Sequence, residues 1–286
     1  MTIAEDSNNS EASSPVLTLC RASYSADWGD YVSFAKHLRD KADADGSDLL
    51  LIDTGDRVEG NAIYDSSKPR GKFTYEIAKE QHIDLLCSGN HELYKGDTAE
   101  GELTHTVPEF KGSYLASNID IYNSKTDKLQ ALAPRFKKFT TKNQGIRILA
   151  FGFLFDFTGN ANNTVVQRVE DTVKEKWFKE VLKDDELDLI IVIGHVDIRS
   201  TEYALLFETI RSAHLDLPIQ FFGGHSHIRV CQYRVVVGLE TPFTVALNFP
   251  SSRLTCHRTT RSLTASPWQS RVAGTWKHSA SCPSTV

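Results

Sequence analysis

Four short apolar runs, each ending at a turn that contains glycine, constrain the fold of this 286-residue chain more than any other feature. The runs are residues 48–53 (DLLLID), 84–87 (DLLC), 187–193 (LDLIIVI) and 218–222 (PIQFF). Short apolar runs that include β-branched residues are typical of strands buried in a sheet that helices cover. In open α/β sheets the carboxyl ends of such strands meet at one edge, where ligands collect. We therefore expect an α/β fold that brings the residues after these runs to a common edge.

Each run is followed by side chains that can bind a metal ion. They are a carboxylate at Asp56, a carboxamide at Asn90, and imidazoles at His195, His225 and His227. Oxygen and nitrogen donors without a thiolate favour Zn, Mn or Fe over calcium or a soft-metal site. One carboxylate can also bridge two cations, as it does in two-metal hydrolases.

The same residues also have structural interpretations. Asp56 can end a strand in a turn, where Asp and Gly are common, and Asn90 can cap a helix. His195 can be a buried, hydrogen-bonded histidine, and the later histidine pair can lie in a surface loop. The repetition of one arrangement at successive strand ends favours metal binding over these alternatives. Glu59 and Glu92 stay open between a functional and a structural role.

Helical spacing of apolar residues predicts helices between the runs. These helices cover residues 30–43, 71–81, 170–182 and 201–213, with further strands at 114–116, 146–153 and 230–237. Asp27 is placed to cap the first helix. The apolar residues of that helix predict one buried face, formed by Tyr31, Phe34, Ala35 and Leu38. Trp177 and Phe178 are expected in the core.

The motifs GDRVEGN, GNHE, GH and GHSH, in this order, resemble those of the calcineurin-like metallophosphoesterases, and the surrounding sequence resembles a fungal branch related to 5′-nucleotidases. The resemblance covers roughly residues 24–229 and implies a four-layer sandwich of two mixed β-sheets flanked by helices, with two divalent metal ions at the strand ends. By matching motif, Asp56 is expected to bridge the metals. The first metal is then completed by Asn90, His195 and His225, and His227 serves the second. His91 is expected to be the catalytic group that donates to the transition state, paired with an acidic residue.

One motif of the resembled family has no counterpart in this chain. The family's first strand ends in Asp-x-His, which supplies most of the second metal's protein ligands. Here the apolar run 16–20 continues as Arg-Ala-Ser-Tyr. The second metal keeps only Asp56 and His227, and two protein ligands rarely hold a metal tightly.

Two functions follow from this pattern. The first is hydrolysis of a phosphate ester, of nucleotide type, by a hydroxide that bridges the metals. The alternative is a catalytically inactive binding module or scaffold that keeps the fold and one metal. The end of the chain does not resemble the nucleotide-binding C-terminal domain of 5′-nucleotidases, so the motifs leave the substrate open.

Composition changes sharply near the C-terminus. Residues 241–286 contain no Asp or Glu and five Lys or Arg, and since the whole chain carries −5, residues 1–240 carry −10. We expect a disordered segment 1–15, a metallophosphoesterase domain at 16–249, incomplete at both ends, and a Ser/Thr-rich basic tail at 250–286. That tail is either authentic and disordered or the product of a misread splice or shifted frame. The abrupt loss of the resemblance favours the second interpretation. A misread splice or shifted frame is also an open interpretation for residues 1–23.

Composition also bears on partners and location. No run approaches the roughly 20 apolar residues that cross a bilayer, and the first residues, MTIAEDSNNS, do not form a signal peptide. A cytoplasmic location is the expectation as the chain stands, and a secreted or vacuolar one if a leader has been lost. The negative body argues against nucleic-acid binding, so the expected partner is a small-molecule phosphate ester. Five scattered cysteines do not indicate a disulfide framework.

Overall fold

The computed structural model describes residues 26–233 and 244–248. The strand expected at 16–20, the termini, and the later part of the strand expected at 230–237 lie outside these residues. The described helices are α2 (Trp28–Ala44), α3 (Ala62–Asp65), α4 (Thr74–Ala78), η1 (Lys79–Gln81), η2 (His91–Leu93), α5 (Gly96–Gly101), η3 (Glu102–Thr106), α6 (Val107–Glu109), α7 (Val169–Thr172), α8 (Lys176–Val181) and α9 (Thr201–Ala213).

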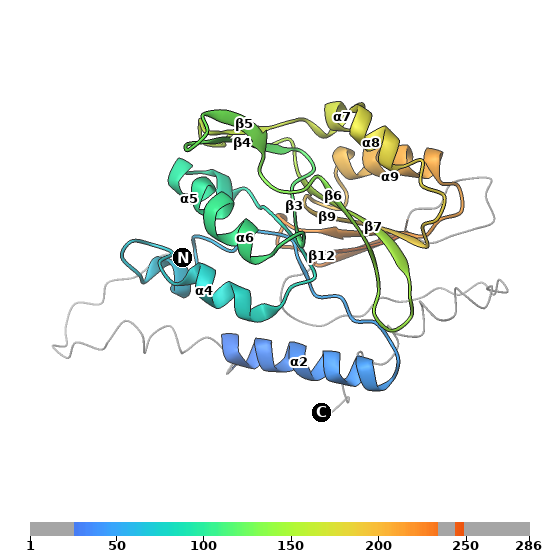
Figure 1. Cartoon of the computed structure of the whole chain (residues 1–286), viewed down its shortest axis with the longest axis horizontal. Coiled ribbons are helices and arrows are strands. Elements are labelled where there is room, and N and C mark those ends of the chain that lie inside the picture. Colours follow the sequence, from blue (N-terminus) through green and yellow to red (C-terminus); the bar gives the residue numbers. More distant parts are fainter. Residues whose placement is uncertain (1–25, 234–243, 249–286) are drawn as a thin grey trace.

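The described strands form three sheets, shown in Figure 1. The largest has the order β11-β12-β10-β9-β7-β6, with bounds Val230–Tyr233, Thr244–Asn248, Ile219–Gly223, Leu189–His195, Arg147–Leu154 and Phe136–Thr140. Its four central strands are parallel and its two edge strands are antiparallel, so the sheet is mixed. A parallel sheet contains β1 (Ile52–Asp53), β2 (Leu85–Cys87) and β3 (Tyr114–Leu115). An antiparallel sheet contains β5 (Lys128–Ala131), β4 (Ile119–Asn123) and β8 (Thr164–Val166).

Alternating side chains of β9 and β2 pack the six-stranded sheet and the parallel three-stranded sheet together as a sandwich. Ile190 and Val192 of β9 face a core shared with α7, α8 and α9, whereas Ile191 and Ile193 face a core that β2 also enters. Leu86 of β2 faces the opposite way, toward α4, α5 and the third sheet. This two-residue alternation buries both faces of β9 and of β2. The expected α/β sandwich with helices on its outer faces is therefore confirmed, with a small antiparallel sheet in addition.

The cap of the first helix was predicted correctly, but its buried face was not. Asp27 caps α2 by accepting from the backbone N–H of Asp30, whose side chain accepts from Asp27 in return. The expected buried face of α2 was wrong, because Phe34 is 62% exposed, Tyr31 is 39% exposed, and only Ala35 is buried among the described helix residues. Apolar spacing shows which side of a helix is apolar, but burial also requires an element packed against that side.

The helix expected at 170–182 is divided into α7 and α8 by an extended residue, Glu175. Both parts still pack the expected residues against the large sheet, since Phe178 is fully buried and Trp177 stacks on Phe136 with ring centroids 6.0 Å apart. The apolar residues predicted to pack on the sheet therefore do so, although the single helix predicted for them is two shorter helices. The helix at 201–213 has the bounds expected for it.

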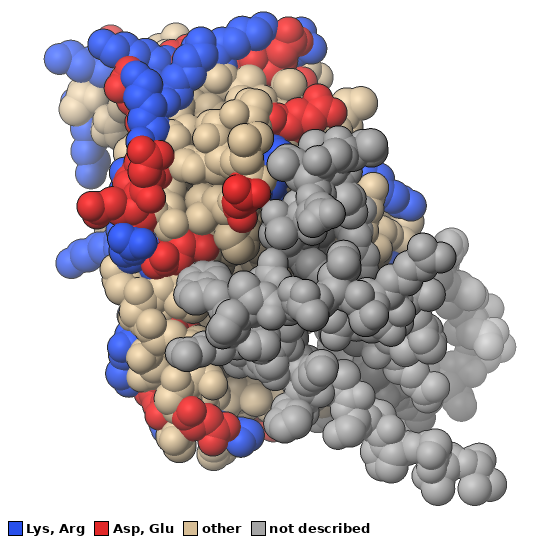
Figure 2. All heavy atoms as spheres, turned by 90° about the vertical axis from the view of Figure 1, so that its right-hand side faces the viewer, with Lys and Arg blue, Asp and Glu red and all other residues tan. Residues whose placement is uncertain are grey.

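Charge on the described part of the face in Figure 2 is mixed. Lys and Arg gather toward one end of that face, with Asp and Glu beside and below them. A continuous basic surface, on which nucleic-acid binding depends, is not what this face presents. Among the described helices, none has the length and apolarity that crossing a bilayer requires.

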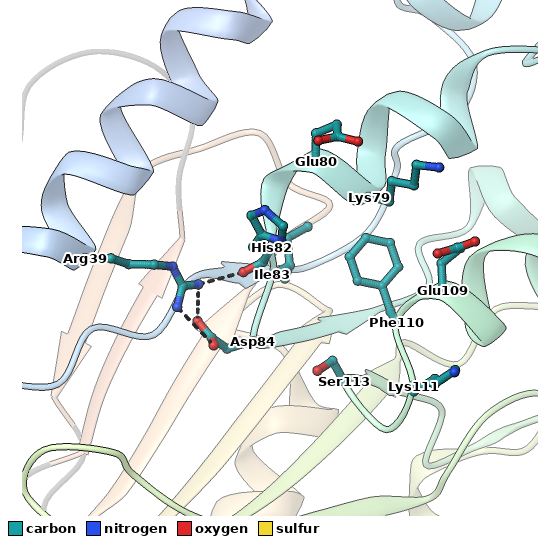
Figure 3. Close-up of a pocket in the computed structure, with 10 residues that line it drawn as sticks. All are labelled: Arg39, Lys79, Glu80, His82, Ile83, Asp84, Glu109, Phe110, Lys111 and Ser113. Atoms are coloured by element: carbon teal, nitrogen blue, oxygen red, sulfur yellow. Dashed lines mark hydrogen bonds and ion pairs between the residues drawn. The ribbon is translucent and has the colours of Figure 1, made fainter. Parts of the chain in front are cut away.

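A groove of about 570 Å³ opens where β2 and β3 begin (Figure 3). Arg39 of α2 lines one side of it and donates to the carboxylate of Asp84 and to the carbonyl of His82, each at 2.6 Å. Asp84 precedes β2, whereas the GNHE motif follows it, so the groove and that motif lie at opposite ends of this strand.

Candidate metal centre

Three of the residues singled out in the sequence meet at the carboxyl edge of the sheets. Asp56 follows β1, His195 ends β9, and His225 follows β10, and each offers one ligand atom within 4.8 Å of the others. His195 Nε2 lies 2.9 Å from Asp56 Oδ2 and 3.3 Å from His225 Nδ1. A carboxylate and two imidazoles at this separation form a donor set that suits a borderline divalent cation.

His195 is held in the orientation that a ligand needs. Its Nδ1 lies 2.8 Å from the carbonyl of Thr54 and donates to it, which directs Nε2 toward Asp56. The ring is 3% exposed. Burial alone lowers the pKa of His195, but the hydrogen bond and charge of Asp56 outweigh burial, and the pKa is raised. Burial likewise raises the pKa of Asp56, while His195 lowers it, and the lowering prevails.

Asn90 carries a buried side-chain oxygen. Its side chain is 3% exposed, and its Nδ2 donates to the hydroxyl of Tyr94 at 2.6 Å. Among the described residues, Asn90 Oδ1 has no hydrogen-bond partner, and the side chain does not cap η2, which rules against the cap interpretation. A buried carboxamide oxygen without a partner costs about 1–3 kcal/mol, and a cation would satisfy it. The neighbours Gly89 and His91 both adjoin Asp56, so the donor set fits one divalent ion.

The ring of His91 faces the group from outside. Its backbone N–H donates to Asp56 Oδ1 at 3.1 Å, and its side chain is 35% exposed. The ring Nε2 lies 3.9 Å from Asp56 Oδ2, and Nδ1 lies 3.9 Å from Glu59 Oε2. Glu59 is therefore the acidic residue beside His91, at ion-pair rather than hydrogen-bond distance.

His227 is not part of the group formed by Asp56, His195 and His225. It is exposed and follows His225 by two residues in a loop where both histidines have positive φ, 71° and 53°. The structure thus brings together three of the four ligands expected for the first metal, and it does not test the role expected for His227 at the second.

The sequence left open the role of Glu92, which joins two ligand loops, the loop after β1 that carries Asp56 and the loop after β2 that carries Asn90. Glu92 is fully buried, and its carboxylate accepts from the backbone N–H groups of Asp56, Arg57 and Gly89 at 3.0, 2.5 and 2.7 Å. One side chain therefore joins the loop after β1 to the loop after β2, and we call these three contacts the clamp. Its signal in the sequence was a carboxylate directly after Asn90 and His91, but its backbone partners lie up to 36 residues away.

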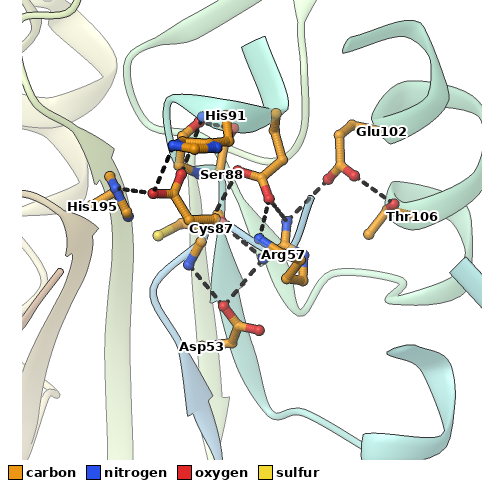
Figure 4. A network of polar contacts seen from close by, with 12 residues as sticks. Asp53, Arg57, Cys87, Ser88, His91, Glu102, Thr106 and His195 are labelled. Atoms are coloured by element: carbon orange, nitrogen blue, oxygen red, sulfur yellow. Dashed lines mark hydrogen bonds and ion pairs between the residues drawn. The ribbon is translucent and has the colours of Figure 1, made fainter. Parts of the chain in front are cut away.

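Arg57 connects the same region to the core through a second set of polar contacts, shown in Figure 4. Its guanidinium donates to the carboxylates of Asp53 and Glu102 at 3.2 and 3.0 Å and to the carbonyl of Cys87 at 2.9 Å. Burial lowers the pKa of Arg57, but the surrounding carboxylates raise it well above its usual value. A buried charge is tolerated when it is paired in this way, and the network fixes both ligand loops from the side of the core.

Comparison with known proteins identifies the class. The chain belongs to the calcineurin-like phosphoesterase family, whose model matches residues 25–229. This confirms the resemblance seen in the four motifs.

Individual relatives agree with the family assignment. The chain is 44% identical over 209 residues to an uncharacterized protein of Schizosaccharomyces pombe, covering 73% of this chain and 34% of that protein. It is 42% identical over 211 residues to a protein of Arthroderma benhamiae called a secreted protein, covering 72% and 32%. The chain thus spans about a third of these curated relatives. The cytoplasmic expectation gains no support from them.

Solved structures also match. The crystal structure of a 5′-nucleotidase from Candida albicans superposes with a TM-score of 0.72 at 40% identity, covering 79% of this chain and 41% of that one. A putative 5′-nucleotidase from Staphylococcus aureus matches at 15% identity with a TM-score of 0.51, which speaks for the fold alone.

Proposed function

We propose that this chain is the metal-dependent domain of a phosphoesterase that hydrolyses a nucleotide-type phosphate ester. The observation that carries the proposal is the convergence of Asp56, His195 and His225 within 4.8 Å at the carboxyl edge. The likeness to a 5′-nucleotidase supports the nucleotide part, and the relative called a secreted protein supports a location outside the cytoplasm.

In this proposal Asp56, Asn90, His195 and His225 hold the cation. A divalent ion at such a site supplies Lewis-acid chemistry, which neutralises phosphoryl charge and acidifies a water molecule. The protein's own groups orient the ligand atoms. The carbonyl of Thr54 accepts from Nδ1 of His195 and so turns Nε2 toward Asp56, and the buried Oδ1 of Asn90 has no hydrogen-bond partner among the described residues.

His91 acts on the leaving group in this proposal. Its ring lies outside the ligand group, partly exposed, with Asp56 and Glu59 flanking its two nitrogens. From there it can donate a proton to the departing oxygen while the cation ligands stay in place. Its role is thereby separable from metal binding by mutation.

A second function, a catalytically inactive binding module, is favoured by one specific observation. The described residues assemble donors for one cation, while His227 stays outside that group and the family's Asp-x-His pair is missing from the sequence. Two-metal chemistry stabilises both the attacking and the leaving oxygen, so a one-metal domain that keeps the fold can bind an ester and not turn it over.

Metal analysis and aryl phosphate hydrolysis on the same purified sample decide between these functions. Bound metal with turnover that Asp56→Ala abolishes supports the enzyme. Asp188→Ala is the matched control, since Asp188 pairs with Arg147 at the opposite end of β9 and should leave both measurements unchanged. Metal without turnover in the wild-type chain supports the inactive module.

Three further variants test the division of roles. Asn90→Ala and His225→Ala should each lower metal occupancy, whereas His91→Ala should slow turnover and leave occupancy intact. His37→Ala, on the exposed side of α2, controls for the loss of an imidazole. Equal loss of metal in the Asn90, His225 and His91 variants contradicts the proposed roles.

A further inference from the structure

Three aromatic side chains form a continuous row along the border of the candidate metal centre. Starting at His225, the ring of Phe155 stacks on the imidazole with centroids 4.4 Å apart. Phe157 follows at 5.4 Å from Phe155, and Tyr94 follows at 5.6 Å from Phe157 in an edge contact. The row ends at His91, whose ring lies 5.0 Å from that of Tyr94. It therefore connects a proposed metal ligand to the proposed proton donor.

The backbone after β7 places the two phenylalanines. Phe155 follows Leu154, the last residue of β7, and its N–H donates to the carbonyl of His195 at 3.3 Å. A tight turn, in which the N–H of Phe157 donates to the carbonyl of Phe155, brings both rings into contact. Asp156 between them turns away and accepts from the N–H of Val169 at 2.8 Å. The loop thus separates its charged residue from the row.

The rings are only partly covered. Phe155 packs against two hydrophobic cores and Phe157 against one, but both remain partly exposed. Tyr94 is 42% exposed. Core packing explains why the phenylalanines are anchored, but it does not explain why the row continues outward to an exposed tyrosine beside His91. Exposed apolar surface that borders a polar site is typical of ligand binding.

We propose that Tyr94, Phe155 and Phe157 bind a planar aromatic part of the leaving group of the phosphate ester. This inference rests on the proposed function, because the row gains its meaning from the phosphoester site beside it. Aromatic faces stack on any planar π system with little regard for its substituents. The row then selects esters of aromatic groups, nucleobases included, over esters of short aliphatic alcohols.

Phosphonates test the row without turnover, because they are not hydrolysed. Binding of benzylphosphonate and methylphosphonate to the Mn²⁺-loaded 286-residue chain is measured by calorimetry. We expect benzylphosphonate to bind about fivefold to tenfold more tightly, the gain typical of one aromatic contact. Phe157→Leu should remove most of this advantage and leave methylphosphonate binding unchanged. Phe73→Leu, which removes an exposed ring outside the row, should change neither.

Three results would each overturn the proposal that the row binds an aromatic group. The first is equal affinity for the two phosphonates, and the second is a benzyl advantage that survives Phe157→Leu. The third is measured on the wild-type chain alone, so that it stands even when Phe157→Leu does not fold. Cyclohexylmethylphosphonate has a saturated ring of similar size, and binding as tight as that of benzylphosphonate would show that aromatic stacking is not selected. If neither benzyl- nor methylphosphonate binds, the phosphoester site itself is refuted, and the row with it.

Discussion

Replacement of Glu92 by glutamine is the sharpest test of how the ligand loops are held. The wild-type carboxylate accepts three backbone N–H groups, two at Oε2 from Asp56 and Gly89 and one at Oε1 from Arg57. Glutamine keeps the shape but offers a single acceptor oxygen. If that oxygen takes the Oε2 position, the new amide N–H₂ faces the N–H of Arg57, and one buried donor loses its partner.

The expected cost follows from these contacts. One unsatisfied buried donor costs about 1–3 kcal/mol, and the loss of a carboxylate near the buried Arg57 adds to it, although Asp53 and Glu102 still pair with that guanidinium. We expect Glu92→Gln to lower the free energy of unfolding of the metal-free chain by about 2–4 kcal/mol. Because the clamp joins two ligand loops, metal affinity should fall as well.

Urea unfolding, followed by circular dichroism after metal removal, measures the change from the midpoint at unchanged slope. Glu170→Gln is the matched control, since its carboxylate pairs with Lys174 on the exposed side of α7 and should contribute nothing measurable. A Glu92→Gln midpoint indistinguishable from that of Glu170→Gln would refute the clamp.

Two further substitutions probe the same edge. Gly55→Ala would place a Cβ 2.2 Å from a backbone nitrogen of the neighbouring ligand loop, so we expect a loss above about 3 kcal/mol in unfolding free energy. Gly46→Ala has a similar positive φ but open space, and should cost only about 1 kcal/mol in the same denaturation assay. Tyr94→Phe removes the hydroxyl that accepts from Asn90 Nδ2 and should weaken metal binding about tenfold in calorimetric titration. Tyr122→Phe, which alters an exposed tyrosine on β4, should have no effect, and equal affinities of the two tyrosine variants would refute the positioning role of Tyr94.

The strand ends were predictable because they depend on a local pattern. The runs before Asp56, Asn90, His195 and His225 are apolar and stop at glycine, and parallel strands align their carboxyl ends whatever the details of packing. Three of these residues offer donor atoms that meet within 4.8 Å. Their proposed roles stay predictions until metal binding is measured.

Other features depended on contacts that no local pattern contains. The three acceptor contacts of Glu92 involve backbone groups, which every residue carries, so the sequence does not distinguish them. Phe34 belongs to an apolar stripe that is exposed among the described residues. His227 was expected at a second metal, and a group of three mutually close donors does not test that role, so it stays a prediction.

Strained backbone conformations are concentrated at the edge that carries the candidate metal centre. Among the described residues, six that are not glycine have positive φ, and four of them, Asp56, Glu59, His225 and His227, lie in the loops that follow β1 and β10. Such conformations cost energy for residues with a Cβ and persist where surrounding contacts enforce them. At Asp56 the enforcing contact is Glu92, which accepts the N–H of that residue. A structural turn would relieve this strain with glycine or asparagine, whereas a carboxylate that must face two imidazoles cannot be exchanged, so the strain at Asp56 is better explained by ligand binding than by chain reversal.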